Sequence, residues 1–396
     1  MLTTLKLLIC SYDFGPVSPE GICTERLVQA FLAEGCKVAL ATSTSAKIRF
    51  QHQNFLPVTL PTWPGRPHRL WTLLARIGGQ IQLPGPHYAW ILRMRALHLQ
   101  ETPDLIYGRA LPFSSAAAAR ALARRIAVPW LIHFSDPVPD AWLEQDSVEF
   151  RHLQPGVRRV TEESSAVSFP TAEGLSHQEQ ILSLELKSKS FVLNHIAPPP
   201  RLLPTRPPGR AKVFGYFGAF YGKRTATALL EGFAQHLRSH PEARLLCVGS
   251  NPASVLPDAR RLGIQAAVAV HERVDDIYPV MATVDVLVSL DAMTGPAIFM
   301  PTKMVEYFVV NRPILLISPA TSPGAALSER FQRTVVHVWE TAPDVIAEGF
   351  RKAGEVKAGG AEYADRFAGM EPFSSKAVAR YFLAEVERRQ ITGTTR

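Results

Sequence analysis

The sequence contains few cysteines, and they form no recognisable pattern. Its 396 residues include only Cys10, Cys23, Cys36 and Cys247. These show neither a CxxC pair nor the close spacing of a disulfide framework or a zinc site. We therefore expect reduced thiols in a reducing compartment, and no metal site built from them.

Long hydrophobic runs are also missing. No uninterrupted apolar stretch approaches the ~20 residues that span a bilayer, and the longest candidate, 116–132, is broken by Arg120, Arg124 and Arg125. The first residues form a short apolar run that turns polar at Ser11 without a small-residue cleavage pattern, so they predict a first strand and not a signal peptide. A cytoplasmic location is expected.

Acidic residues are absent between Glu34 and Glu101, although the whole chain carries a net charge of only +8. The basic residues in that window are Lys37, Lys47, Arg49, Arg66, Arg69, Arg76, Arg93 and Arg95. Within it, 60–98 mixes arginines with leucines and with the aromatic residues Trp63, Trp71, Tyr88 and Trp90. This mixture is typical of contact with an anionic membrane surface on the inner face of the plasma membrane. Arginine-rich helices around the core are the alternative. No nucleic-acid motif accompanies the charge, so nucleic acid is not an expected partner.

What the chain does contain is an α/β rhythm. An apolar run at 6–10, a helical pattern at 23–34 that ends at Gly35, and a second apolar run at 37–41 predict a β-α-β unit. Further strands are expected at 105–107, 130–134 and 166–170, with helices at 114–126 and 173–184. Strands that alternate with helices in this way imply a parallel sheet.

A proline-rich stretch at 194–212 interrupts this rhythm and predicts a linker. Beyond it, strands are expected at 213–217, 244–248, 284–290 and 314–318, with helices at 225–238, 275–281 and 303–310. Since 396 residues exceed the ~250–300 at which one core stops growing, two domains are the natural reading. We predict an α/β fold with two facing Rossmann-like domains, divided into 1–193, a linker at 194–212, 213–365, and a C-terminal helix within 366–396.

The most informative stretch is GPAIFMPTKMVEYFVVNRPILLI at 295–317. Thr302 is expected to cap a helix whose free N–H groups, together with Lys303, form a phosphate site. Glu306, one turn on, could accept hydrogen bonds from ribose hydroxyls, and Asn311 is expected to end the helix in a left-handed conformation. An ordinary capped helix with a solvated glutamate explains the pattern equally well.

Four segments in the same order resemble a bacterial branch of the family 4 retaining glycosyltransferases, which have the two-domain GT-B fold. PTKMVEYFVVNRPILLI resembles its P-S-K-x-x-E-Y segment, and GYFGAFYGKRTATALLEGF resembles the start of its donor domain. PDLIYGRALPFSSAAAARALARRIAVPWLIHFSDP and SYDFGPVSPEGICTERLVQAFLAEGCKVALAT resemble segments of its first domain. The resemblance spans residues 5 to about 320.

The resemblance implies a transfer from a nucleoside-diphosphate sugar to a glycan or lipid-linked acceptor, with retention, in cell-surface polysaccharide synthesis. It implies that the donor site consists of Gly218, Tyr221, Lys223, Arg224, Gly295, Ile298, Phe299, Pro301, Thr302, Lys303 and Glu306. Lys303, His133 and Asp136 are the implied catalytic residues. The loop with Gly15, Glu20 and Gly21 would face acceptor or phosphate. No cofactor or metal is expected, because the cationic side chains would carry the diphosphate charge.

The sequence departs from the family pattern at three places. Ala219 stands where the family has an arginine, Ile298 stands where it has the first of two glutamates, and His133 and Ser135 replace the Asp and Arg of D-x-R-D-P. His133 would contact the donor sugar or be a core histidine at a strand end, and the second is favoured. A tight turn equally explains Gly15 and Gly21.

Two other functions remain open at this point. A sugar-nucleotide epimerase has the same fold but needs acid-base carboxylates facing the sugar. An inactive scaffold of a polysaccharide assembly complex would explain the missing arginine and glutamate. A dinucleotide dehydrogenase is disfavoured, because no GxGxxG follows the first strand.

Overall fold

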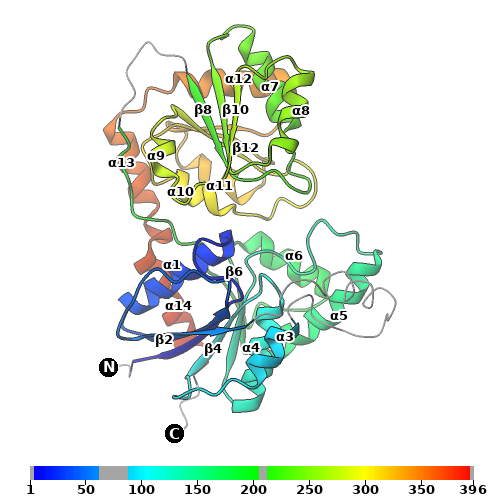
Figure 1. Ribbon diagram of the computed structural model, residues 1–396, viewed down its shortest axis with the longest axis vertical. Helices are drawn as coiled ribbons and strands as arrows, with labels where there is room; N and C mark the ends of the chain where they lie inside the picture. The colour runs from blue at the N-terminus through cyan, green and yellow to red at the C-terminus, as the bar shows by residue number, and fades with distance from the viewer. Residues whose placement is uncertain (1–3, 62–87, 205–211, 393–396) are drawn as a thin grey trace. The chain divides into compact units, whose positions relative to one another are not determined.

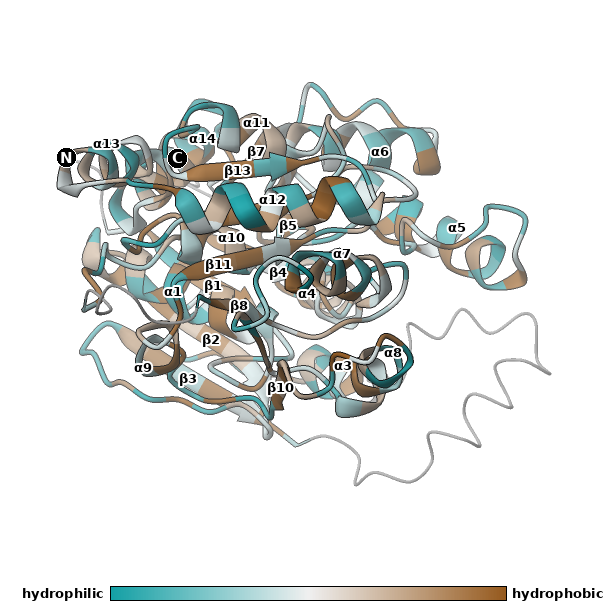
Figure 2. Cartoon of the chain, turned by 90° about the horizontal axis from the view of Figure 1, so that it is seen from above, coloured by the Kyte–Doolittle hydropathy of each residue, from teal (hydrophilic) through white to brown (hydrophobic). Residues whose placement is uncertain are grey.

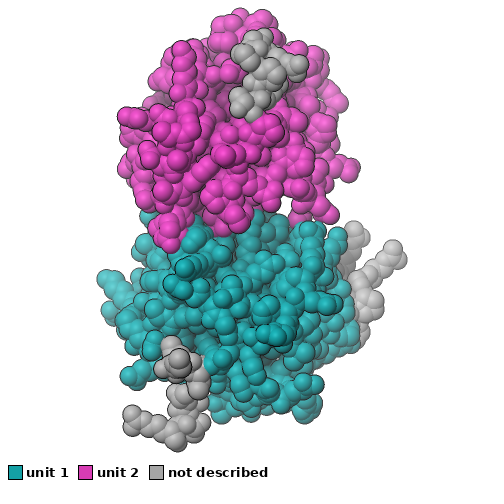
Figure 3. Space-filling view, turned by 90° about the vertical axis from the view of Figure 1, so that its left-hand side faces the viewer, with its two compact units in different colours: residues 1–196, 373–396 teal, residues 197–372 magenta. Residues whose placement is uncertain are grey.

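Parallel strands form the centre of both halves of the chain. The computed structural model describes residues 4–61, 88–204 and 212–392 (Figure 1). It divides into two compact units, coloured separately in Figure 3: unit 1 is Met1–Ile196 with Phe373–Arg396, and unit 2 is Ala197–Pro372. Every strand pairing within the described residues is parallel, as the alternating β-α pattern predicted.

Unit 1 is built on a seven-stranded sheet in the order β3-β2-β1-β4-β5-β6-β7. Its strands are β1 (Lys6–Cys10), β2 (Lys37–Ser43), β3 (Phe55–Leu60), β4 (Leu105–Arg109), β5 (Trp130–His133), β6 (Ala166–Phe169) and β7 (Ser190–Val192). Its helices are α1 (Pro19–Ala33), α3 (Tyr88–Arg95), α4 (Ser114–Ile126), α5 (Val148–Glu163), α6 (Ala172–Leu182) and α14 (Ser375–Arg388).

The two faces of this sheet carry separate apolar clusters. One face packs against α1 and α14, where the rings of Phe31 and Phe382 lie 4.7 Å apart. The other packs against α3 to α6. The C-terminal helix therefore belongs to unit 1 although unit 2 precedes it in the chain. The predicted helix end at Gly35 is confirmed, since α1 ends at Ala33 and Gly35 has a φ of 86°.

Unit 2 is built on a six-stranded sheet in the order β10-β9-β8-β11-β12-β13. Its strands are β8 (Val213–Phe217), β9 (Arg244–Val248), β10 (Val268–His271), β11 (Val286–Leu290), β12 (Ile314–Ile317) and β13 (Val335–Val338). The helices are α7 (Thr227–Leu237), α8 (Leu256–Arg261), α9 (Tyr278–Met281), α10 (Thr302–Tyr307), α11 (Pro323–Glu329), α12 (Pro343–Glu355) and α13 (Gly360–Gly369), with 3₁₀ turns at Pro252–Ser254 and Glu371–Phe373.

The central strands of unit 2, β8, β11 and β12, are buried and apolar, and Figure 2 shows β11 in brown while α12 carries both colours. An α-helix that is apolar on one side only must bury that side, and α12 does so against α7. A Cβ atom on Gly232 of α7 would lie 2.3 Å from Ile346 of α12, so the two helices approach each other too closely for any side chain there.

Two details of the predicted motif around Lys303 are wrong. Helix α10 begins at Thr302 itself, so Thr302 is the first helical residue and not the N-cap. Pro301 occupies the N-cap position, and no side chain caps the helix. Asn311 does not end a helix in a left-handed conformation, since α10 stops at Tyr307. Instead, its side-chain amide pairs with the backbone N–H and C=O of Leu203.

The basic aromatic segment at 60–98 is described only in part, because 62–87 lie outside the described residues. Trp90 is fully buried and its ring makes an edge contact with Tyr12 at 5.6 Å, so its predicted place at a membrane surface is wrong. Arg93 and Arg95 are exposed, as is Leu92. Within the described residues, no helix has the length and apolar character needed to cross a bilayer.

Candidate functional site

Both sheets have a point at which the strand order reverses. In unit 1 it lies between β1 and β4, and in unit 2 between β8 and β11. Ligands of open parallel sheets bind outside the carboxyl ends of the strands at such a switch point. Charged side chains stand at both of these points.

In unit 2, Lys303 is held over the end of β8 by the helix that carries it. Tyr307, one turn further along α10, accepts a hydrogen bond at 3.0 Å from the backbone N–H of Phe217, the last residue of β8. Lys303 Nζ then lies 3.8 Å from the centre of the Tyr216 ring, a cation–π distance. Gly218 adopts a φ of 142°, which glycine accepts readily, and its missing side chain leaves space below the lysine.

Arg224 and Asp291 form a buried ion pair beside this lysine. Arg224 Nη2 donates to Asp291 Oδ1 at 2.8 Å, and the two residues are 7% and 5% exposed. Arg224 Nη1 donates to the Tyr221 hydroxyl at 3.1 Å, while Asp291 Oδ1 also accepts from the backbone N–H of Ala292 at 2.8 Å. Arg224 Nε is buried without a hydrogen-bond partner among the described residues.

The electrostatics of this group favour an incoming anion. Burial, and next the positive charge of Arg224, hold the pKa of Lys303 well below its usual value. Asp291 and Cys247 act in the opposite direction but do not offset these effects. An anion placed against the two cations would relieve the cost of charging a buried ammonium group.

The structure places two adjacent predicted donor residues, Lys223 and Arg224, in different environments. Lys223 is exposed, whereas Arg224 is buried in the ion pair with Asp291. The remaining predicted donor residues lie in the loop between β11 and α10 or on α10: Gly295 is exposed with a φ of 90°, Ile298 is buried, and Phe299, Pro301, Thr302 and Glu306 are half-buried.

In unit 1, a closed triangle of polar side chains occupies the switch point. Arg109 at the end of β4 donates from Nε to Glu20 Oε1 at 2.6 Å and from Nη2 to the Ser135 hydroxyl at 3.1 Å. Ser135 in turn donates to Glu20 Oε2 at 2.6 Å. Arg109 and Glu20 are 3% and 4% exposed. The pair is therefore buried but well hydrogen-bonded, as a buried charge pair must be.

His133 ends β5 next to this triangle and is 2% exposed. Its Nδ1 lies 2.9 Å from the Ser168 hydroxyl, and its Nε2 has no hydrogen-bond partner among the described residues. Burial, and next the charge of Arg109, hold the pKa of His133 well below its usual value, so the imidazole is neutral at physiological pH. Asp136 follows in the loop and is half-buried.

The glycines of the first loop make close backbone contacts within unit 1. Gly15, with a φ of 75°, donates a backbone hydrogen bond to Gly21 O at 3.0 Å, and a Cβ on Gly15 would lie 2.1 Å from Lys47 O. A Cβ on Gly21 would lie 2.4 Å from Gly15 O. These contacts account for both glycines without a ligand. Ser18 caps α1 by accepting from the N–H of Gly21, which brings Glu20 to the triangle.

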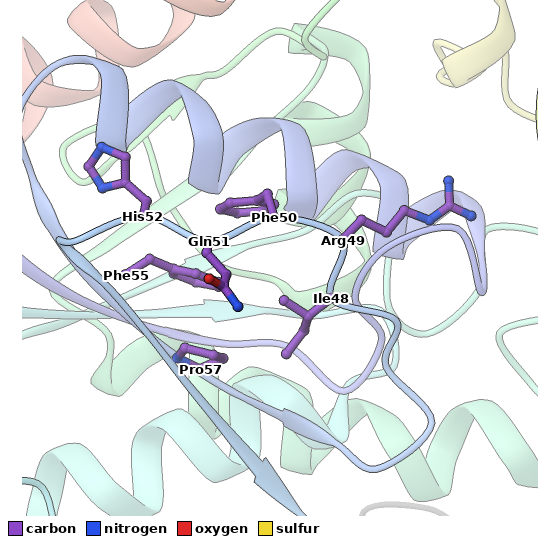
Figure 4. Close-up of a pocket in the computed structure, with 7 residues that line it drawn as sticks. All are labelled: Ile48, Arg49, Phe50, Gln51, His52, Phe55 and Pro57. Atoms are coloured by element: carbon purple, nitrogen blue, oxygen red, sulfur yellow. The ribbon is translucent and has the colours of Figure 1, made fainter.

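A surface hollow of about 670 Å³ lies elsewhere in unit 1 (Figure 4). It is lined by residues of the loop at 48–52 and by Phe55 and Pro57 of β3, with Arg49 and His52 at its two ends in the view. None of the predicted site residues lines it. Over the described ranges, no group of three or more His, Cys, Asp or Glu side chains could hold a metal ion.

Two doubly wound parallel units of this kind are the architecture of the GT-B fold. Family models bear this out: a glycosyl transferase 4-like domain matches residues 21–180, and glycosyl transferases group 1 matches residues 211–348. The chain belongs to the family 4-type glycosyltransferases with the GT-B fold.

Solved structures agree on the fold. The chain is similar to Alr3699/HepE of Anabaena, determined in complex with UDP and glucose, at 13% identity and a TM-score of 0.66 over 97% of this chain and 100% of that one. It is similar to WaaG, a glycosyltransferase involved in lipopolysaccharide biosynthesis, at 15% identity and a TM-score of 0.60 over 98% of this chain and 100% of that one. The chain is also similar to a UDP-forming α,α-trehalose-phosphate synthase from Burkholderia xenovorans, at 14% identity and a TM-score of 0.66 over 98% of this chain and 100% of that one. No curated protein matches the chain in sequence.

Sequence reasoning missed three residues of these clusters: Arg109, Tyr216 and Asp291. Each stands in or directly after a buried strand, and a charged residue at the carboxyl end of a parallel strand is the signal that could have identified Arg109 and Asp291. Tyr216 gave no such signal, because a tyrosine inside an apolar strand predicts only core.

Proposed function

We propose that this chain transfers a glycosyl group from a nucleoside-diphosphate sugar to a hydroxyl of a glycan or lipid-linked acceptor, with retention of configuration. The observation that carries the proposal is the cationic group at the switch point of unit 2. Lys303 lies over Tyr216, and Arg224 pairs with Asp291. With both basic side chains protonated, two positive charges face one negative charge, which favours a diphosphate. Structures of the same fold bound to UDP and to UDP-2-fluoro glucose support this choice of donor.

The reaction needs stabilisation of the departing diphosphate more than it needs an acid and a base. As the bond between the sugar C1 and the phosphate oxygen breaks, negative charge grows on that oxygen, and preorganised cations lower the energy of this state. The acceptor hydroxyl attacks C1 from the same face, and its proton passes to the departing phosphate oxygen. Glu306 would accept hydrogen bonds from the ribose hydroxyls, and the loop at 295–302 would contact the sugar.

We propose that the reaction proceeds without a metal ion or cofactor, since Lys303 and Arg224 would supply the positive charge that a divalent cation supplies elsewhere. Unit 1 would receive the acceptor near Glu20, His133 and Asp136. Because the imidazole of His133 is neutral, it could hydrogen-bond a hydroxyl group without competing for the diphosphate.

Cell-surface polysaccharide synthesis on the inner face of the plasma membrane is the proposed setting. The exposed Arg93, Arg95 and Leu92 of α3 support contact with anionic lipid. Flotation with liposomes tests this: binding should need anionic lipid and weaken in Arg93→Gln/Arg95→Gln. Equal binding to neutral liposomes would contradict it.

The activity is tested by the release of nucleoside diphosphate from a panel of nucleotide sugars, with glycan and lipid-linked acceptors, followed by NMR of the product anomer. Transfer with an unchanged anomeric configuration is expected. Interconversion of the nucleotide sugar without transfer would indicate the epimerase alternative. Absence of both turnover and nucleotide binding would favour the scaffold, which the missing arginine at Ala219 keeps as a second candidate.

A further inference from the structure

The carboxylate of Asp291 has no role in the donor site described so far. A carboxylate next to a proposed diphosphate site is unexpected, because it repels the ligand. Yet Asp291 is only 5% exposed and stands directly after β11 at the switch point. Its Oδ1 is turned toward protein by two hydrogen bonds, one from Arg224 Nη2 and one from the backbone N–H of Ala292, both at 2.8 Å.

The effect of these bonds is to fix the guanidinium of Arg224. An arginine side chain loses much rotamer entropy on being ordered. Asp291 holds one side of the guanidinium, and the Tyr221 hydroxyl accepts from Nη1 at 3.1 Å. Arg224 is thereby ordered before any ligand arrives, and it stays close enough to Lys303 to depress the pKa of that lysine.

The position of Arg224 also bears on a gap in the chain. The family pattern has an arginine directly after Gly218, where this chain has the exposed Ala219. Arg224 comes five residues later, on the same loop after β8, and Lys303 Nζ would lie 3.8 Å from a Cβ atom on Gly218. Two basic side chains, Arg224 from this loop and Lys303 from α10, thus stand near the end of β8, although position 219 itself carries no charge.

We propose that Asp291 is a positioning residue that holds Arg224 beside Lys303, where this arginine contacts the diphosphate in a chain that lacks a cation at position 219. The inference rests on the proposed donor site. The ligand chemistry is a nucleoside diphosphate. Asp291 itself touches neither substrate nor reacting atoms.

The test is titration calorimetry of the full chain with UDP, GDP and dTDP, and then with the matching monophosphate and nucleoside of whichever diphosphate binds. Asp291→Asn should weaken diphosphate binding roughly tenfold or more, because the guanidinium loses its charged partner. Nucleoside binding should stay within about twofold. Glu348→Gln, which breaks an exposed ion pair with Arg351 on α12, is the matched control and should leave both affinities unchanged.

A rescue variant separates positioning from a general loss of structure. Ala219→Arg added to Asp291→Asn should restore most of the diphosphate affinity, because it returns a cation to the position that the family pattern uses. If Asp291→Asn fails to fold, Arg224→Met/Asp291→Leu replaces the pair by apolar side chains of similar size, which buried pairs tolerate. The same loss and the same rescue are then expected in that background.

Two outcomes overturn the proposal. If the wild type binds a diphosphate and Asp291→Asn binds it equally well, Asp291 does not position Arg224. If affinity falls but Ala219→Arg does not restore it, the loss is structural. Failure of the wild type to bind any nucleoside diphosphate would instead overturn the proposed function, and this inference with it.

Discussion

The two units place the same kind of ion pair at the same kind of position and surround it differently. Unit 1 has Arg109 and Glu20, and unit 2 has Arg224 and Asp291, each pair buried at the carboxyl end of a parallel sheet. In unit 1 the Ser135 hydroxyl contacts both partners and closes the group. In unit 2 a further cation, Lys303, lies beside the pair.

The difference lies in the charge left over for a ligand. Arg109 and Glu20 cancel and His133 is neutral, so the group in unit 1 carries no net charge. In unit 2, Lys303 and Arg224 against Asp291 leave one positive charge when Lys303 is protonated, and a bound diphosphate would favour that protonation. A buried ion pair therefore does not by itself identify a binding site. The proposed assignment, an anionic donor in unit 2 and hydroxyl groups in unit 1, rests on Lys303, the further cation beside the pair in unit 2.

The largest expected effect concerns the stability of unit 1. Glu20→Gln leaves the guanidinium of Arg109 buried without its carboxylate, and breaking a buried pair in this way costs about 3–5 kcal/mol. Denaturant unfolding should show a loss of this size in the free energy of unfolding, with diphosphate affinity unchanged at temperatures where the variant is folded. A loss below about 1 kcal/mol would mean that the triangle contributes little to stability.

The next effect concerns catalysis in unit 2. Lys303→Ala removes a cation from the departing diphosphate, and the loss of one such stabilising group lowers kcat about 100- to 1,000-fold. Stability should hardly change, because the pKa of Lys303 indicates that burial already disfavours its charge. Lys352→Ala, which removes an exposed lysine 3.7 Å from Glu348, is the control and should leave kcat unchanged. If Lys303→Ala kept the wild-type kcat, the further cation in unit 2 would have no catalytic role, and the functional difference drawn between the two ion pairs would fail.

A smaller effect comes from the neutral histidine of unit 1. Because the folded-state pKa of His133 lies below 6.5, the unfolded chain binds a proton that the folded chain does not, and stability is lost as pH falls below 6.5. The slope is at most about 1.4 kcal/mol per pH unit. His133→Gln should lose less free energy of unfolding than wild type between pH 7 and pH 5.5. Burial also lowers the pKa of His236, to about 4, but this histidine is present in both proteins, so its contribution cancels when the two pH curves are compared. Parallel pH curves would show that His133 is not held neutral.

The smallest effect concerns an exposed ion pair of unit 1, which serves as a comparison for the buried pair of Arg109 and Glu20. Arg158 and Glu162 form an exposed i,i+4 pair at 2.9 Å on α5 of unit 1. Glu162→Gln should cost only about 0.3–0.5 kcal/mol, because water screens both charges. A cost comparable to that of Glu20→Gln would show that burial is not what distinguishes the two pairs.

Much of the fold could be predicted because strands and helices alternate with the correct periods. The strands at 6–10, 213–217 and 244–248 and the helix at 114–126 have the predicted bounds. Strand β3 was missed because its exposed edge position lets polar and apolar residues mix, as Leu56, Pro57 and Thr59 show. Helix α5 was missed because Pro155 and Gly156 stand inside it and argue against a helix.

The site was less predictable than the fold, since its partners come together only in three dimensions. Lys303 and Arg224 could be named from the sequence, but Asp291 lies 67 residues from its partner Arg224, and Arg109 lies 89 residues from Glu20. No local pattern encodes such pairings. The same applies to Trp90, whose surroundings of arginine and leucine suggested a surface although the ring lies in the core.

The central claim is that unit 2 binds the diphosphate of a nucleotide sugar through Lys303 and Arg224. The most direct test is the melting temperature of the full chain with UDP-, GDP- and dTDP-sugars. A ligand at 100 times its Kd stabilises the folded state by about 2.7 kcal/mol, which is readily seen as a higher melting temperature. The account predicts a rise with one nucleotide and its loss in Lys303→Ala. No rise with any of them, or the same rise in Lys303→Ala, would contradict it.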